Sequence, residues 1–214
     1  MLTKIKTTKE EITFIIPTRE DLEQLLETGR VCYPAETLFS PDILEQQMQY
    51  NPECIHVLKN TKTNRVLGCI TMSPMKKETL DRLINLEIDE NKVPAQDYLP
   101  FSPDTVQDIY ITNIVIKPAI KEKVYAGKLF VAILEYAKEL LEKGIEIRKI
   151  YCVATTEEGE KLAKNLQFTL LQTKCIGDQE EFRHSYVLDI QNINSKHKLV
   201  KTFQSHMENI KVKK

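Results

Sequence analysis

A strand–helix–strand stretch in the second half of the chain constrains the fold more than any other feature. Residues 108–116 read DIYITNIVI, an apolar, β-branched run that is typical of a central strand. Residues 126–143 then place apolar side chains on one helical face, and Gly144 stands where a helix end is expected. A further strand is predicted at 148–154. A strand, a helix and a strand in succession require a parallel pair joined by a crossover helix.

The rest of the chain predicts mostly antiparallel neighbours. Thr18 is expected to cap a helix with Asp21 in its first turn, and Ser40-Pro41 is expected to open another, with Ile43 facing inward. The predicted elements are strands at 12–17, 54–58, 65–72, 168–175 and 182–190, and helices at 19–32, from Ser40 onward, near 76–86, and from Thr155 or Thr156 through Leu166. We therefore expect an α/β fold with a mixed, mostly antiparallel central sheet of about seven strands and helices on both faces.

Two segments fall outside this regular order. Residues 74–107 form an insertion between strands, and two readings stay open: a lid or substrate-contacting segment, and a mobile surface excursion. Residues 191–214 form a basic tail with apolar side chains at helical spacing. We expect this tail to dock on the body or on a second subunit, as in a homodimer, rather than on nucleic acid or a membrane. The predicted domain is thus 1–190, followed by the tail.

Composition narrows the class of protein. Hydrophobic residues make up 42% of the 214 residues, enough for a sizeable core, and the net charge of -1 gives no field toward nucleic acid or anionic membranes. The five cysteines have irregular spacing without a C-x-x-C pair, so we expect no metal site and five buried thiols. The N-terminus lacks the apolar stretch of a signal peptide, and no run is long enough to span a membrane, so we expect a cytoplasmic protein.

The junction between the central strand and the long helix is suited to binding an anion. The strand ends at Ile116-Lys117-Pro118, and a lysine-rich loop leads into the helix. Backbone N–H groups at such a junction have no intrahelical partner and carry the positive end of the helix dipole. A pyrophosphate binds well there, and Lys121, Lys123 and Lys128 add positive charge.

This register resembles the GNAT superfamily of acetyl-CoA-dependent N-acetyltransferases, over roughly residues 12–190. In that family, a strand ending V-x-P precedes an R/Q-x-x-G-x-G/A loop, and here Lys121, Val124 and Ala126 fall on the three defined loop positions. The resemblance implies acetyl-CoA as cosubstrate, with its pyrophosphate on the loop and its pantetheine arm paired with the strand backbone. The cofactor-binding residues that it implies are Ile114, Val115, Ile116, Lys121, Lys123, Val124, Tyr125, Ala126, Gly127, Lys128 and Thr156.

The sequence departs from the family pattern at three places. Val124 replaces a glycine, Ala163 replaces the tyrosine that protonates the leaving thiolate in many relatives, and the strand around Tyr110 lacks the glutamate that many relatives use as a base. Asn113 and Tyr110 are the candidate catalytic residues that remain on this strand. Cys152 has no evident base beside it and is expected to be a buried thiol rather than a nucleophile.

Three functions follow from this reading. The first is an N-acetyltransferase that acts on a primary amine of a small molecule, peptide or protein. The acidic residues of the insertion would attract such a cationic amine; they are Glu78, Asp81, Glu87, Asp89 and Glu90. More often, however, such a run of acids is simply a solvated face. The second is a GNAT-fold binding module without turnover, which the three departures favour. The third is an acyltransferase that takes its acyl group from a carrier protein.

Overall fold

The chain folds into two compact units that share one strand. The computed structural model describes residues 3–6, 11–33, 38–116, 129, 133, 136, 137, 139–176 and 181–190. Unit 1 comprises Met1–Ser73, Pro94–Phe101 and Thr112–Tyr136, and unit 2 comprises Pro74–Val93, Ser102–Ile111 and Ala137–Lys214. The shared strand, β5 (Val106–Ile116), therefore passes from unit 2 into unit 1 between Ile111 and Thr112.

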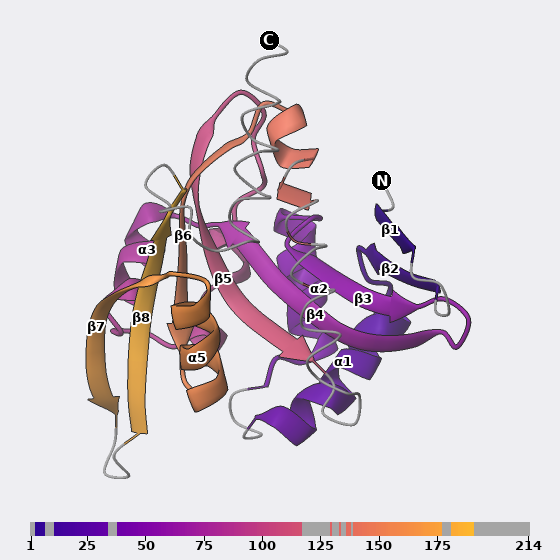
Figure 1. The fold of residues 1–214 in the computed structure, drawn as a ribbon, viewed down its shortest axis with the longest axis horizontal. Coiled ribbons are helices and arrows are strands. Elements are labelled where there is room, and N and C mark those ends of the chain that lie inside the picture. The colour runs from indigo at the N-terminus through magenta and orange to yellow at the C-terminus, as the bar shows by residue number, and fades with distance from the viewer. Residues whose placement is uncertain are drawn as a thin grey trace. The chain divides into compact units, whose positions relative to one another are not determined.

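The strands follow the order β1-β2-β3-β4-β5-β6-β8-β7 in an eight-stranded mixed sheet (Figure 1). Their bounds are β1 Thr3–Lys6, β2 Glu11–Ile15, β3 Ile55–Asn60, β4 Arg65–Pro74, β5 Val106–Ile116, β6 Glu146–Ala154, β7 Thr169–Ile176 and β8 Glu181–Asp189. The predicted parallel pair is confirmed, because β5 and β6 run parallel, while the pairs β1–β2, β2–β3, β3–β4, β6–β8 and β7–β8 are antiparallel. The predicted α/β class is therefore confirmed, and β1 is the strand that the sequence pattern did not reveal.

The helices begin and end close to the residues at which the capping pattern of the sequence predicted their ends. They are α1 Arg19–Cys32, α2 Pro41–Tyr50, α3 Lys77–Ile84 and α5 Glu157–Asn165, with short 3-10 turns at Glu90–Lys92 (η2) and Ala95–Asp97 (η3). Thr18 and Asp21 form a capping box, and Ser40 caps α2 ahead of Pro41. Where the structure describes the long helix expected at 126–143, at 129, 133, 136, 137 and 139–142, the residues are helical, and Gly144 follows with φ 82°. Within the described part of the chain, no helix has both the length and the hydropathy needed to cross a bilayer.

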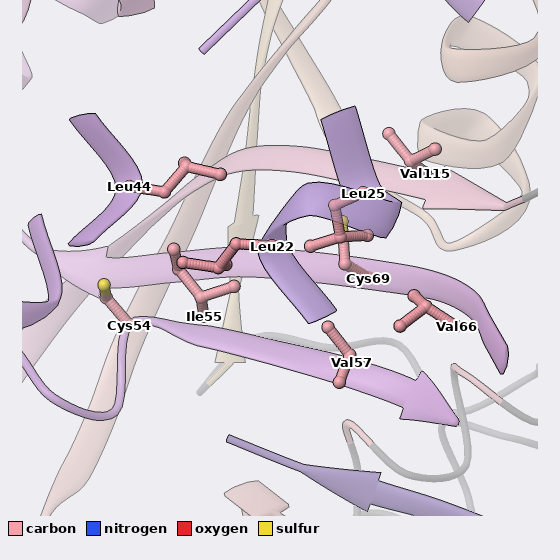
Figure 2. Packing of buried hydrophobic residues seen from close by; sticks show 9 residues of the cluster. All are labelled: Leu22, Leu25, Leu44, Cys54, Ile55, Val57, Val66, Cys69 and Val115. Carbon is pink, nitrogen blue, oxygen red and sulfur yellow. The ribbon is translucent and has the colours of Figure 1, made fainter. Parts of the chain in front are cut away.

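Unit 1 packs α1 and α2 on one face of its strands. Leu22 and Leu25 of α1 and Leu44 of α2 point at the strand residues of the same core cluster, as Figure 2 shows. Those strand residues are Ile55, Val57, Val66, Cys69 and Val115. On the other face of β3, the ring of His56 stacks on Phe14 with ring centroids 4.8 Å apart and lies 4.3 Å from the Tyr136 ring, which belongs to the long helix. Helices therefore cover both faces of these strands.

Unit 2 is built on β6, against which α3 and α5 both pack. The first part of the insertion belongs to this unit and is tied to β7 and β8 by side chains. Gln172 Nε2 donates to the Ile84 carbonyl at 2.7 Å, Lys174 Nζ donates to the Leu86 carbonyl at 3.1 Å, and Arg183 forms an ion pair with Asp89. One of the two sequence interpretations of the insertion, a mobile surface excursion, did not predict these three contacts.

Two smaller expectations differ from the structure. Ile43 was expected to face inward, but it is 39% exposed because the inward face of α2 is formed by Leu44 and Gln47. The five cysteines were expected to be buried. Cys54 and Cys69 are buried, whereas Cys32 and Cys152 are only partly buried and Cys175, on the outermost strand β7, is exposed.

Candidate active site

The second half of β5 presents alternate backbone groups to two edges. Gly68 of β4 comes so close to β5 that a Cβ atom at this position would lie 2.5 Å from the Val115 carbonyl oxygen. The Val115 carbonyl is thus directed toward β4. Because successive residues of an extended strand direct their backbone groups to opposite edges, we expect the N–H and C=O groups of Ile114 and Ile116 to be directed to the other edge. The register between β5 and β6 runs from Val106↔Glu146 to Ile111↔Cys152, and β5 then continues to Ile116 in unit 1.

Asn113 is held by a tyrosine from α1's C-terminal end. The Tyr33 hydroxyl donates to Asn113 Oδ1 at 3.1 Å, and Asn113 is half-buried. A carboxamide has one acceptor oxygen and one nitrogen with two donor protons. Since Tyr33 engages the oxygen, the amide nitrogen of Asn113 is directed away from Tyr33 and can donate elsewhere. Sequence reasoning missed Tyr33, because no local signal links positions that lie 80 residues apart in the chain.

Tyr110, the other candidate on β5, faces the interior of unit 2. It is 1% exposed, and its hydroxyl donates to Glu90 Oε1 at 2.7 Å. Its role in catalysis stays a prediction, and the geometry limits what that role can be. The hydrogen bond that this buried phenol donates lowers the pKa of the Glu90 carboxyl group.

Glu90 is a titratable residue that lies against β5 through its hydrogen bond with Tyr110. Burial raises the pKa of its carboxyl group, and the hydrogen bond from Tyr110 and the charge of Arg183 offset only part of that rise. The sequence pattern counted Glu90 only among the acids of the insertion. Its position 20 residues before Tyr110, in a segment without periodicity, gave no signal of the contact.

The remaining candidates take structural roles in the described residues. Thr156 caps α5, where its hydroxyl accepts from the Gly159 N–H at 3.1 Å, and its predicted cofactor contact stays a prediction. Ala163 is buried against Ala154 and Tyr186, so core packing fills the position at which the family places a tyrosine. Burial raises the pKa of Cys152 to about 12, so its thiol stays protonated at neutral pH, in line with the prediction that it is no nucleophile.

The loop residues predicted to bind pyrophosphate lie outside the described residues. These are Lys121, Lys123, Val124, Tyr125, Ala126, Gly127 and Lys128. Besides Thr156, the predicted cofactor-binding residues that the structure describes are Ile114, Val115 and Ile116, which lie together on β5 in unit 1. Val115 is 5% exposed and packs into the core, which fixes this part of the strand.

Solved structures of known proteins share this architecture at low sequence identity. Ard1 from Thermoplasma volcanium matches with a TM-score of 0.56 and 11% identity, covering 83% of this chain and 97% of that chain. NAA60 from Arabidopsis thaliana, in complex with acetyl-CoA, matches with a TM-score of 0.55 and 15% identity, covering 85% and 99%. The GNAT-like decarboxylase GphF, in complex with isobutyryl-CoA, matches with a TM-score of 0.58 and 13% identity, covering 82% and 98%.

No protein-family model matches the sequence, and no curated protein matches it significantly. The structural matches span nearly the full length of the other proteins, so they concern the whole fold rather than a shared fragment. At these identities, a structural likeness shows the architecture and not the chemistry. This chain has the fold of the GNAT N-acetyltransferases.

Proposed function

We propose that the protein is an acyl-CoA-dependent N-acyltransferase that transfers an acetyl group from acetyl-CoA to a primary amine of a small molecule, peptide or protein. The observation that carries the proposal is the GNAT fold, found in proteins whose structures hold acetyl-CoA or isobutyryl-CoA. These solved structures include a complex with acetyl-CoA and a decarboxylase in complex with isobutyryl-CoA, so the fold alone supports acyl-CoA binding more directly than it supports one reaction.

We assign the pantetheine arm of coenzyme A to the backbone of β5. That arm carries two amide groups, which need N–H and C=O partners in an extended arrangement. Ile114 and Ile116 are expected to direct such groups to the edge of β5 that faces away from β4. The buried Val115 side chain and the close contact at Gly68 hold this strand in place, so its backbone groups need no reordering on binding.

We assign the pyrophosphate to the loop from Lys121 to Lys128, as the register of the sequence predicts. The N–H groups and lysines of this loop would neutralise the phosphates. Val124 would still allow binding if its side chain points away from them. Thr156 lies at the start of α5, where its hydroxyl oxygen already accepts a hydrogen bond from the Gly159 N–H.

The transfer itself makes three demands on the protein. The amine must be neutral, the negative oxygen that develops on the acyl group must be stabilised, and the thiolate must leave. Acetyl-CoA supplies an activated acyl thioester, so the barrier that remains is one of orientation and proton transfer. The amide nitrogen of Asn113, oriented by Tyr33, is a donor that could stabilise the developing negative charge.

A binding module without turnover is the second candidate. The buried Ala163 favours it, because no phenol at this position can protonate the leaving thiolate. This candidate shares the cofactor site with the first and differs only in the chemical step, so one experiment separates the two.

The test is calorimetric titration of the protein with acetyl-CoA, followed by measurement of free thiol after addition of amines. We expect saturable binding that Lys121→Ala weakens roughly tenfold, which corresponds to the loss of one charged hydrogen bond. Lys62→Ala, which removes an exposed lysine from the β3–β4 turn, serves as the matched control and should leave binding unchanged. Thiol release supports the enzyme, whereas binding without release supports the module. Absence of binding at millimolar acetyl-CoA would reject both.

A further inference from the structure

The outer end of the sheet in unit 2 carries an uncovered apolar surface. Within the described residues, β7 is the last strand of the sheet, so one of its edges has no neighbouring strand there (Figure 1). Leu170 of β7 is 48% exposed, and Phe182 of β8 is 52% exposed. Cys175, which pairs with Phe182 across the two strands, is exposed as well. Natural proteins often cover such an edge with a helix or loop, because a bare edge can pair with other chains.

These exposed side chains lie on the face of the sheet that α5 partly covers. Tyr186 of β8 packs against Ala163 of α5 in a small core cluster. Alternate residues of a strand share a face, which places Phe182 on the same face as Tyr186. Their cross-strand partners are Leu170 and Cys175, which therefore lie on this face too. We call the surface formed by Leu170, Cys175 and Phe182 the β7–β8 strip.

The charges around the strip favour a positively charged partner. Lys174 and Arg183, the lysine and arginine of β7 and β8, alternate with strip residues and contact the insertion on the other face. On the face of the strip, α5 begins with Glu157, Glu158 and Glu160. Lysines of the same helix pair with Glu157 and Glu160, whereas Glu158 is exposed. A basic segment would therefore meet acidic groups at this face and no lysine or arginine of either strand.

The chain carries a basic segment directly after β8. This is the tail of residues 191–214, which lies outside the described residues. Its sequence holds six lysines and one acid, Glu208. Apolar side chains recur in it at helical spacing from Leu199 to Ile210, so the sequence predicts a helix with one apolar side. A segment of this kind needs an apolar surface with acidic surroundings, which the β7–β8 strip offers.

The point at which the tail begins and its length both suit the strip. β8 ends at Asp189, close to Leu170, because Val187 pairs with Thr169 at the start of β7. Between Leu170 and Cys175 the strip runs for about 16 Å along the strand. The apolar stretch of the tail has the same length, about 16 Å, as a helix. The residues between β8 and this stretch reach about 30 Å when extended, enough to turn back along the strand.

We propose that the basic tail docks on the β7–β8 strip of its own chain. Leu199, Phe203 and Ile210 lie against the strip, and the lysines of the tail lie toward the acids of α5. A segment tethered beside its binding surface has an effective concentration there in roughly the millimolar range, which favours the strip of the same chain over that of a second copy. The proposal goes beyond the proposed function, because it assigns an interaction surface and no step of acyl transfer.

The test measures alkylation of Cys175 by iodoacetamide in the full chain, with the modified peptide identified by mass spectrometry. A docked tail covers this thiol of the strip. We expect Phe203→Asp to speed its alkylation roughly tenfold, because a tail that is docked about nine-tenths of the time slows the reaction by that factor. Ser205→Asp is the matched control, since it adds the same charge about 200° around the helical pattern from Phe203 and should leave the rate unchanged.

A second variant changes the strip instead of the tail. Leu170→Asp places a charge on the docking surface at an exposed position and should speed alkylation as Phe203→Asp does. Docking within one chain does not depend on protein concentration, so the protection of Cys175 should survive a roughly hundredfold dilution.

The other outcomes overturn the proposal. Equal alkylation rates in the wild type, Phe203→Asp and Leu170→Asp would show that no tail covers the strip. Protection that disappears on dilution, together with a dimer in light scattering, would assign the strip to a second copy of the chain. Faster alkylation in Ser205→Asp would contradict the assignment of the apolar side of the tail to the strip. The measurement needs no acetyl-CoA, so its result is independent of the proposed function.

Discussion

Among single residues, Asp21 joins a helix cap to the interior of the sheet. One carboxylate oxygen accepts from the Thr18 N–H at 3.0 Å and so closes the first turn of α1. The other oxygen accepts from Lys59 Nζ of β3 at 2.6 Å. The Asp21 side chain is 0% exposed and that of Lys59 is 11% exposed, so the two charges are paired out of contact with bulk water. Removal of either partner therefore leaves the other charge buried and unpaired.

We predict that Asp21→Asn lowers the free energy of unfolding at pH 7 by about 3–5 kcal/mol. Burial pushes the pKa of Asp21 upward, but the hydrogen bonds from Lys59 and Thr18 outweigh it and hold the pKa below its ordinary value of 3.8. A carboxyl group with a lowered pKa stabilises the folded state above the unfolded pKa, and this contribution is lost as the pH falls through the folded pKa. Urea unfolding should therefore show the largest gap between wild type and variant above pH 3.8, and a shrinking gap at lower pH.

Asp42→Asn is the matched control for this prediction. Asp42 pairs with Arg19 on the surface, where its side chain is 74% exposed, so its loss should cost at most about 1 kcal/mol. Equal effects of Asp21→Asn and Asp42→Asn would show that the buried pair contributes no more than a surface pair.

Among single residues, the sequence predicts contacts between near neighbours in the chain and misses contacts between residues that are far apart in it. The caps at Thr18 and Ser40 were predicted because capping depends on residues within one helical turn. The contacts Lys59–Asp21, Tyr33–Asn113 and Tyr110–Glu90 join separate elements. No spacing rule relates such partners, so these three contacts could be recognised only in the folded chain.

Among the elements, α3 was predicted from the sequence, but no sequence pattern predicted the contacts that hold its C-terminal end against β7. The last carbonyl groups of a helix have no intrahelical partner. A side chain of β7 supplies one partner here, because Gln172 donates to the Ile84 carbonyl, and Lys174 donates to the carbonyl of Leu86, two residues beyond the end of the helix. The positive charge of Lys174 also suits the negative end of the helix dipole. Helical spacing predicted α3, whereas the contacts between the insertion and β7 could be found only in the folded chain.

We predict that Gly68→Ala destabilises the sheet where β4 meets β5. The added Cβ atom would lie 2.5 Å from the Val115 carbonyl oxygen, so one of two strand backbones must move. Such overpacking costs typically about 1–3 kcal/mol, measurable by urea unfolding. Because the move would also displace the backbone of Ile114 and Ile116, acetyl-CoA binding should weaken as well.

Gly29→Ala tests whether crowding against backbone is the cause. Its Cβ atom would lie 2.9 Å from Cδ2 of Leu38, the flexible end of a side chain that can turn aside. Alanine is also favoured over glycine within a helix such as α1. Gly29→Ala should therefore cost less than Gly68→Ala. The reverse order would contradict the assignment of Gly68 as a close-contact position.

On the scale of the whole molecule, β5 belongs to both units. Ile109 and Tyr110 are each 1% exposed in the core of unit 2, and Val115 is 5% exposed in the core of unit 1. The sequence predicted this strand, its parallel partner and the class of fold, because strong apolar patterns specify them. It did not predict the division into two units or the strand β1, because neither depends on a pattern within one segment. Because β5 carries core residues of both units, it cannot come out of one core and still remain ordered along its whole length.

We therefore predict that the two units unfold in one cooperative transition. Leu22 of unit 1 and Leu83 of unit 2 are each 1% exposed, so Leu22→Ala and Leu83→Ala should each cost about 2–5 kcal/mol. Hydrogen exchange across a urea series can follow β3 in unit 1 and β8 in unit 2 separately. With shared unfolding, either substitution should move the transition of both strands by the same amount. If Leu22→Ala moves only β3 and Leu83→Ala moves only β8, the units unfold independently, and β5 must then break its order near Ile111 while one half remains folded.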